Sequence, residues 1–187
     1  MSEHRADRTV IVAAGLALVL LTGVSTIALG AARGAFDHRS SAPDGQCAAP
    51  RLSGTVVDVT LTDMAGPMVQ RAGIGGLMRV LASSSRVQAG TVSLRVANTG
   101  SLVHELVVLP LPRGQHVGDR QVSADGRVTE TGSVGEVSRT CAAGSGDGID
   151  PGAIGWVTLR LPPGTYELVC NLVGHYAAGM YTQLTVT

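Results

Sequence analysis

The longest apolar stretch of the chain covers residues 10–32, near the N-terminus, and no charged residue interrupts it. A secretory h-region usually has roughly 7 to 15 residues, whereas about 20 apolar residues cross the hydrocarbon core of a bilayer. The stretch also lacks the polar face of a helix packed on a globular core. We therefore expect residues 1–33 to form a membrane-spanning signal anchor. Small residues at Gly30, Ala31 and Ala32 leave a cleaved signal peptide as the alternative.

The composition changes after this stretch. Residues 34–49 are rich in Gly, Ser, Asp, Pro and Ala, which bury little apolar surface, so we expect a flexible linker there. Residues 50–187 have the length of one domain. Because a large domain that follows a first apolar segment is usually translocated, we expect a single-pass protein of the cell membrane with this domain on the extracytoplasmic side, or a secreted domain if the segment is cleaved.

Short stretches of alternating apolar and polar residues recur through the expected domain, and such alternation is typical of β-strands. Turn-forming residues separate them, as at Asn98-Thr99-Gly100 and Pro162-Pro163-Gly164. Abundant Gly and scarce aromatic residues favour strands joined by tight turns over a helical bundle. The pattern predicts an all-β fold, a Greek-key β-sandwich. Its strands are expected at residues 54–61, 91–97, 103–109, 155–161, 165–169 and 181–186.

Two regions show no clear pattern of this kind. No secondary-structure element is predicted for residues 62–86. Residues 110–154 form a long connection between strands, with a short hairpin expected near residues 122–128. Loops of this length in a compact domain are usually functional or partly ordered.

Overall charge argues against several classes of partner. The chain has 14 Lys and Arg and 14 Asp and Glu residues, so its formal net charge is zero. Nucleic-acid binding normally requires a basic surface, and strong electrostatic steering requires a net charge or a charged patch. We therefore expect neither a nucleic-acid partner nor strong charge steering.

The C-terminal part of the chain combines three side chains that bind soft metal ions. Cys170, His175 and Met180 form the pattern C-x4-H-x4-M. A strand that ends at the cysteine, followed by a compact Gly-containing loop, would direct a thiolate, an imidazole and a thioether to one point. Two His nitrogens, one Cys sulfur and a weak axial Met are the ligands of a blue-copper site. His104, which follows the Asn98-Thr99-Gly100 turn within an apolar run, is the candidate for the second imidazole.

These two segments resemble the ligand segments of the cupredoxins, the superfamily of plastocyanin and azurin. The spacing is most similar to that of rusticyanin, sulfocyanin and auracyanin, and the resemblance covers residues 54–187. It implies one type 1 copper ion bound by His104, Cys170 and His175, with Met180 as the long axial ligand. It also implies single-electron transfer between redox partners rather than enzymatic activity.

The sequence departs from the resemblance at one position beside a proposed ligand. Many relatives carry Asn or a similar residue there, which connects the two ligand segments, whereas this chain has Glu105. The hydrogen bonds around the Cys sulfur depend on that connection and tune the metal. The sequence therefore gives no prediction of whether Glu105 connects the two ligand segments.

Other residues bear on alternative functions. Met64, Met68 and Met78 could bind Cu(I), which makes a copper-delivery protein in copper homeostasis the alternative, although Met more often fills gaps in a core. Zinc fits the ligand set poorly because a thioether is a weak ligand for it. Only five His residues are present, and two of them, His4 and His38, precede the expected domain, so additional copper centres of an enzyme are not expected.

Two cysteines remain outside the proposed site. In an exported domain we expect Cys47 and Cys141 to form an intrachain disulfide, which leaves Cys170 as the thiol for copper. His116 in the long connection, like His38 in the linker, is expected to be solvated.

The surroundings of the C-terminal ligand histidine suggest where electrons leave the site. His175 has the small neighbours Gly174, Ala177 and Ala178, so we expect its edge to emerge through an apolar patch on which redox partners dock transiently. The three tyrosines of the chain are expected to pack around the site. They are Tyr166, Tyr176 and Tyr181.

Overall fold

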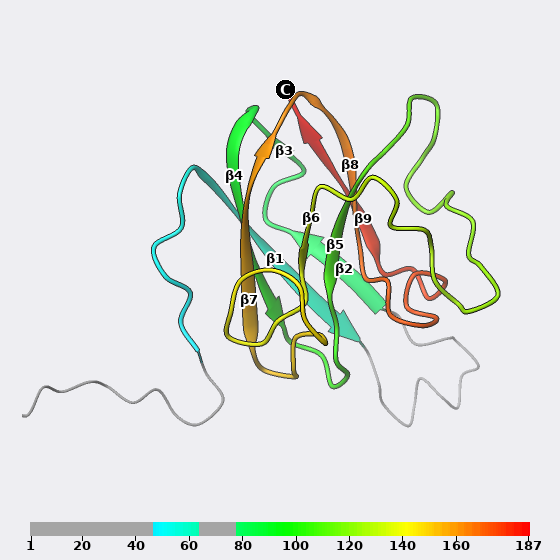
Figure 1. Ribbon diagram of the computed structural model, residues 1–187, viewed down its shortest axis with the longest axis horizontal. Coiled ribbons are helices and arrows are strands. Elements are labelled where there is room, and N and C mark those ends of the chain that lie inside the picture. Colours follow the sequence, from blue (N-terminus) through cyan, green and yellow to red (C-terminus); the bar gives the residue numbers. More distant parts are fainter. Residues whose placement is uncertain (1–46, 64–77) are drawn as a thin grey trace, which may run out of the picture. The chain divides into compact units, whose positions relative to one another are not determined.

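The computed structural model describes residues 47–63 and 78–187, which form two β-sheets (Figure 1). No helix in these two ranges is long and apolar enough to cross a membrane. The expected membrane-spanning segment and most of the expected linker lie outside the described residues, as do Met64 and Met68. The all-β prediction is confirmed for the described part of the chain.

The first sheet has four strands, and its two central strands are parallel. In spatial order they are β2 (Met78–Ala82), β1 (Thr55–Asp63), β4 (Gly90–Asn98) and β7 (Ile154–Leu161). In the register of β1 and β4, Thr55 lies opposite Val92 and Leu61 lies opposite Asn98. In the antiparallel register of β4 and β7, Ala97 lies opposite Ile154.

The second sheet has five strands and carries the C-terminal part of the chain. In spatial order they are β3 (Arg86–Val87), β9 (Tyr181–Val186), β8 (Gly164–Val169), β5 (Leu106–Pro110) and β6 (Gly135–Val137). The central strand β8 runs antiparallel to both of its neighbours, with Val169 opposite Val107 on one side and Tyr181 on the other.

The core lies between the two sheets and follows from the alternation in the sequence. Successive side chains of a strand point to opposite faces, so every second residue of β4 faces inward. Val92, Leu94 and Val96 are fully buried there, and Leu106 and Leu168 of the second sheet belong to the same cluster. Each fully buried side chain of this kind contributes about 1.5–3 kcal/mol relative to an exposed one.

Two local predictions differ from the structure. The strand expected at residues 103–109 begins at Leu106, and His104 instead forms an isolated bridge with Ile149. The hairpin expected near residues 122–128 is a tight turn without strands, in which the Ser123 amide donates to the Arg127 carbonyl at 2.8 Å. The turn segment forms no sheet pairing because β6, and not this segment, occupies the free edge of β5.

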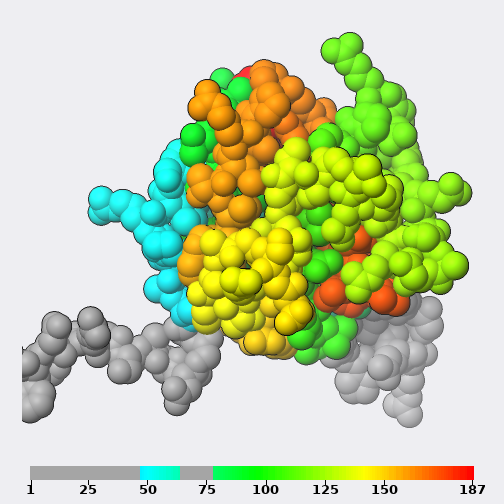
Figure 2. All heavy atoms as spheres, viewed as in Figure 1, coloured from blue at the N-terminus to red at the C-terminus, as the bar shows by residue number. Residues whose placement is uncertain are grey.

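Two loops cover the face of the molecule that Figure 2 shows, and both form hydrogen bonds with ligand candidates or with residues next to them. We refer to residues 111–134 as the long loop and to residues 138–153 as the disulfide loop. The expected disulfide between Cys47 and Cys141 is present and attaches the N-terminal end of the described chain to the disulfide loop.

Candidate metal centre

The turn that precedes His104 is held by the side chain of Asn98, the last residue of β4. This buried amide donates to the Leu102 carbonyl at 2.7 Å and to the Ile149 carbonyl at 2.8 Å, and it accepts from the Gly100 amide at 2.9 Å. The His104 amide donates to the same Ile149 carbonyl at 3.2 Å. A single side chain therefore links the end of β4, the turn and the disulfide loop, and fixes the backbone that carries His104.

The His104 ring is oriented by Asp63, the last residue of β1. The distance from His104 Nε2 to Asp63 Oδ1 is 2.8 Å, and both side chains are almost fully buried. Asp63 also accepts hydrogen bonds from the amides of Ser101 and Leu102 and from the Ser101 hydroxyl. Burial raises the pKa of Asp63, but these hydrogen bonds outweigh burial and lower the pKa to about 2.

The ionised Asp63 determines which nitrogen of His104 is free. A carboxylate only accepts hydrogen bonds, so Nε2 of the ring carries the hydrogen. In the neutral imidazole, Nδ1 then keeps its lone pair and is able to bind a metal ion. The sequence reasoning did not identify Asp63. The available signal was its place at the end of the inward-facing series Val57, Val59 and Leu61, where a charged residue requires a partner.

The other ligand candidates lie on the loop between β8 and β9, which we call the ligand loop (residues 170–180). Its ends are joined by a hydrogen bond from the Cys170 amide to the Met180 carbonyl, 3.0 Å. The Met180 amide donates to the His175 carbonyl at 3.1 Å. Gly174 and Gly179 have φ values of 80° and 89°, a region that favours glycine, and they allow the tight reversals. The sequence therefore folds this segment into a closed, internally bonded loop.

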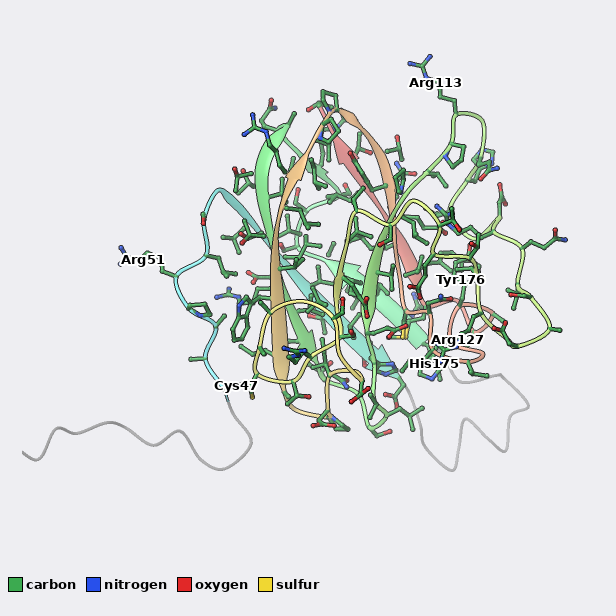
Figure 3. All side chains as sticks on the ribbon, viewed as in Figure 1. Cys47, Arg51, Arg113, Arg127, His175 and Tyr176 are labelled. Atoms are coloured by element: carbon green, nitrogen blue, oxygen red, sulfur yellow. A yellow bond between two sulfur atoms is a disulfide. The ribbon has the colours of Figure 1, made fainter. Side chains whose placement is uncertain are left out.

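Three donor atoms from the two segments converge at one point. His104 Nδ1 lies 3.2 Å from His175 Nδ1, and Cys170 Sγ lies 3.3 Å from His175 Nδ1 and 3.9 Å from His104 Nδ1. Cys170 and His104 are fully buried, whereas His175, labelled in Figure 3, is only partly buried. Met180 is fully buried and belongs to the same core cluster as Cys170.

The environment of Cys170 favours a thiol unless a cation is present. Burial raises the pKa of Cys170 to about 12, although amides of Glu105 and Leu172 lower it in part. The Glu105 amide lies 3.4 Å from Sγ and donates to it. Burial and the neighbouring His104 both lower the pKa of His175, which keeps that ring neutral and able to act as a ligand. A thiolate at this position requires a metal ion to balance it.

The side chain of Glu105 stands where the resemblance implies a connecting amide. It is buried, and its Oε1 atom has no hydrogen-bond partner in the described part of the chain. Burial and the nearby Glu136 and Glu130 raise the pKa of Glu105 to about 7. The Glu105 amide therefore connects the two ligand segments through the sulfur, while Oε1 of the Glu105 carboxyl group is left without a hydrogen-bond partner.

The donor set fits a copper ion. For a metal ion with the bond lengths of zinc, about 2.0 Å to nitrogen and about 2.3 Å to sulfur, three ligands in one plane lie roughly 3.5 Å apart. The three observed separations of 3.2, 3.3 and 3.9 Å surround this value. Two imidazole nitrogens and one thiolate are the equatorial ligands of type 1 copper.

The remaining predictions about side chains near the site are partly correct. Tyr176 and Tyr181 pack against each other with ring centroids 5.0 Å apart beside the ligand loop. Tyr166 does not pack around the site, because it lies near the start of β8 and its hydroxyl donates to the Pro162 carbonyl.

Met78 packs against the hydrophobic core, which agrees with the expectation that Met more often fills gaps in a core. His116 is exposed and lies 3.3 Å from Asp119.

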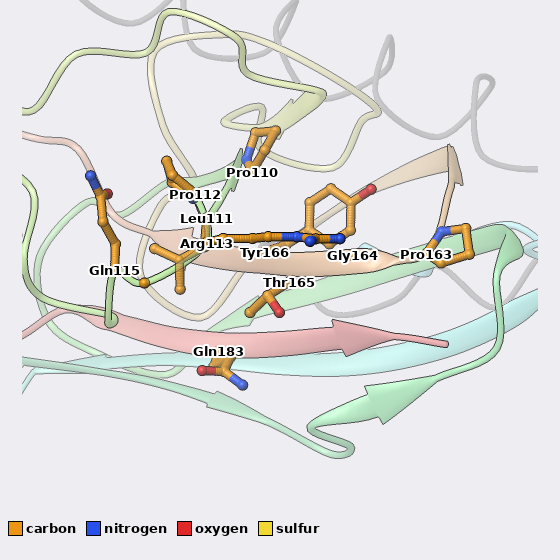
Figure 4. Close-up of a pocket in the computed structure, with 11 residues that line it drawn as sticks. Pro110, Leu111, Pro112, Arg113, Gln115, Pro163, Gly164, Thr165, Tyr166 and Gln183 are labelled. Atoms are coloured by element: carbon orange, nitrogen blue, oxygen red, sulfur yellow. The ribbon is translucent and has the colours of Figure 1, made fainter.

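The pocket drawn in Figure 4 is separate from the three donor atoms. It is lined by residues of the long loop and by Pro163, Gly164, Thr165 and Tyr166, at the start of β8. Cys170 follows the opposite end of that strand, so this pocket does not belong to the metal centre.

Comparison with known proteins identifies the family of this arrangement. A family model described as the sulfocyanin (SoxE) domain matches residues 83–187. No curated protein matches the chain in sequence.

Among solved structures, auracyanin from Roseiflexus castenholzii is 19% identical, with 73% of this chain and 98% of that chain covered and a TM-score of 0.42. Rusticyanin from Thiobacillus ferrooxidans is 20% identical, with 72% and 79% covered and a TM-score of 0.44. Auracyanin B is 23% identical, with 74% and 93% covered and a TM-score of 0.44.

Proposed function

Because the chain belongs to the sulfocyanin (SoxE) domain family of cupredoxins, we propose that it is a membrane-tethered blue-copper protein that passes single electrons between redox partners. His104, Cys170 and His175 would hold the copper ion, and Met180, buried in the same core cluster as Cys170, would supply a thioether as the fourth ligand. The convergence of the three donor atoms within 3.9 Å carries this proposal. Residues 1–33 anchor the protein, and residues 34–49 connect the anchor to an extracytoplasmic domain.

The chain contributes rigidity and exclusion of water to this function. Bound copper supplies the one-electron change between Cu(I) and Cu(II). Asp63 fixes the ring of His104, the Glu105 amide holds the sulfur of Cys170, and the ligand loop is bonded to itself. Because these contacts are made between protein groups, they hold the ligands in place in both oxidation states, and the ligands need to move little when an electron arrives or leaves.

Electrons enter and leave at the partly buried His175. Exposed apolar side chains lie on both ligand-bearing segments, with Val173 at 62% and Leu102 at 42% exposure. Such an apolar surface suits brief docking to a redox partner, which typically buries a small area. In Figure 2 the orange-red atoms of the C-terminal segment reach the surface beside the two covering loops.

The visible and electron paramagnetic spectra of the full chain loaded with Cu(II) test this proposal. We expect an intense thiolate-to-copper band that is lost in Cys170→Ser, while His116→Gln, a change at an exposed histidine outside the site, leaves the band intact. A protein that binds Cu(I) without colour and releases it to an acceptor would instead be a copper-delivery protein. Retention of the band in Cys170→Ser would contradict the proposed ligand set.

A further inference from the structure

The ligand loop carries two of the three donor atoms, and Gly or Ala occupies four of its positions. Such small side chains bury little surface, so they anchor a loop weakly. The hydrogen bonds inside the loop, such as that from the Ala178 amide to the Gly174 carbonyl, close it on itself but do not attach it to another element. The position of His175 relative to Cys170 therefore depends on contacts that leave the loop.

Asn171, which directly follows Cys170, attaches the ligand loop to the long loop. Its side chain is buried. Asn171 Oδ1 accepts from the Val128 amide at 2.8 Å, and Nδ2 donates to the Val128 carbonyl at 2.9 Å. Nδ2 also donates to Glu130 Oε1 at 2.7 Å. The side-chain amide thus pairs with the backbone of Val128 as a neighbouring strand would, although Val128 lies outside both sheets.

Two further contacts join the same loops. The Gly174 amide donates to the Gly126 carbonyl at 3.0 Å. Val128 is buried and shares a small core cluster with Tyr176. Gly174 and Tyr176 flank His175 in the sequence, so the long loop contacts the ligand loop on both sides of this residue. Figure 3 shows the long loop passing beside the segment that carries His175.

The hydrogen bonds of Asn171 are costly to lose. A buried backbone group without a partner is unfavourable, and buried backbone groups are almost always paired. Val128 is 4% exposed, and in the described part of the chain its amide and carbonyl find their partners in Asn171. The long loop can therefore leave the ligand loop only when these groups become unpaired or reach water. This restriction makes the two loops one unit.

From these contacts we propose that Asn171 is a positioning residue of the metal centre, which fixes the chain between Cys170 and His175 by holding the long loop against it. The inference rests on the proposed electron-transfer function. Ligands that are held by their surroundings move little between oxidation states, and a small movement keeps electron transfer fast. The contacts of Asn171 involve none of the three donor atoms, so it acts through the two loops.

Hydrogen exchange of the copper-free protein tests the attachment itself. Gly174 is exposed, so the protection of its amide depends on the hydrogen bond to Gly126. Asn171→Leu keeps a similar side-chain volume but neither donates nor accepts, and we expect the Gly174 amide to exchange about tenfold faster by NMR. Gln121→Leu, at an exposed amide of the same loop, is the matched control and should leave this rate unchanged. An unchanged rate in Asn171→Leu would overturn the inference.

The copper-loaded protein separates positioning from stability alone. We expect Asn171→Leu to keep the blue band but to change the copper hyperfine splitting in the electron paramagnetic spectrum. Its electron self-exchange rate should fall about threefold. A variant that is less stable but has an unchanged splitting and self-exchange rate would overturn the inference, because Asn171 would then be structural only. Absence of the blue band from the unmodified protein would contradict the proposed function, and the inference would fall for that separate reason.

Glu130→Ala covers the case in which Asn171→Leu does not fold. Glu130 is exposed and provides one of the three hydrogen-bond partners of the Asn171 side chain, so its removal leaves the pairing with Val128 in place. We expect the Gly174 amide to exchange about twofold faster in this variant. In that case an unchanged exchange rate in Glu130→Ala would overturn the inference.

Discussion

Asp63 places a full negative charge one hydrogen bond away from a proposed copper ligand. Its pKa of about 2 keeps it ionised, and its side chain is 1% exposed, so solvent screens the charge little. A buried anion at this position stabilises Cu(II) more than Cu(I) and lowers the reduction potential.

Asp63→Asn is therefore expected to raise the reduction potential by roughly 90 mV. This value corresponds to an interaction on the order of 2 kcal/mol at an effective dielectric constant of about 20. The measurement is a redox titration followed at the visible band. Asp58→Asn, a change at an exposed aspartate of the same strand, is the matched control and should leave the potential unchanged. An unchanged or lower potential in Asp63→Asn would contradict this role.

Glu105 gives the copper-free protein a pH-dependent stability. Its pKa is about 7 in the folded chain, against an ordinary value of 4.5, so the folded state holds the proton more tightly. The resulting stabilisation is complete below pH 4.5 and is lost as the pH rises through 7, by up to about 3 kcal/mol. We expect Glu105→Gln to be progressively more stable than the unmodified protein over this range in urea unfolding. Parallel pH profiles would show that the carboxyl group does not titrate as described.

At the scale of elements, the long loop is held on β8 by a buried network. Glu167 of β8 accepts hydrogen bonds from the Arg120 guanidinium at 2.5 Å and from the Tyr176 hydroxyl at 2.9 Å. Tyr176 follows His175, and its hydroxyl also accepts from the Arg120 amide. Gly118 has a φ of 91° and packs closely on the Tyr181 ring, so a side chain at this position would force Tyr181 to move. The network therefore joins the long loop, the central strand and the ligand loop.

Removal of the Arg120 side chain is expected to destabilise the fold, because the buried Glu167 carboxylate then lacks its partner. Arg120→Ala leaves the fully buried Glu167 carboxylate without its counter-ion, and we expect a loss on the order of 3–5 kcal/mol in the free energy of unfolding. Arg113→Ala, on the exposed tip of the same loop, should change stability by less than about 0.5 kcal/mol. Urea unfolding of the two variants measures the difference, and similar stabilities would contradict a structural role for the network.

At the scale of the whole molecule, the disulfide closes a loop with a sequence separation of 94 residues. A cross-link of this span removes much conformational freedom from the unfolded chain. Cys47→Ser/Cys141→Ser is expected to lower the free energy of unfolding by about 2–5 kcal/mol, measured by thermal or urea unfolding with copper bound. The blue band should persist in the folded variant, because the cross-link contacts none of the three donor atoms. Loss of the band in a folded variant would mean that the disulfide loop positions His104 more directly than the Asn98 contacts indicate.

The fold class and the ligand candidates could be predicted because their signals are local. Alternation of apolar and polar residues marks strands such as β4, since side-chain direction in a strand repeats every two residues. The spacing of Cys170, His175 and Met180 defines a short loop whose ends are fixed by neighbouring strands. The disulfide was also predictable, because two cysteines remained once Cys170 was assigned to the metal.

The partners of these residues depended on contacts between distant segments. Asp63 lies 41 positions before His104, and Arg120 lies 47 positions before Glu167, so no local pattern connects them. The position of Cys47 likewise depends on the first sheet, which places Ile154 opposite Ala97. The sequence alone determined which side chains are able to bind copper, because that follows from residue type and spacing. Only the tertiary structure decided their charge environment and the distances between their donor atoms, because both arise where separate strands meet.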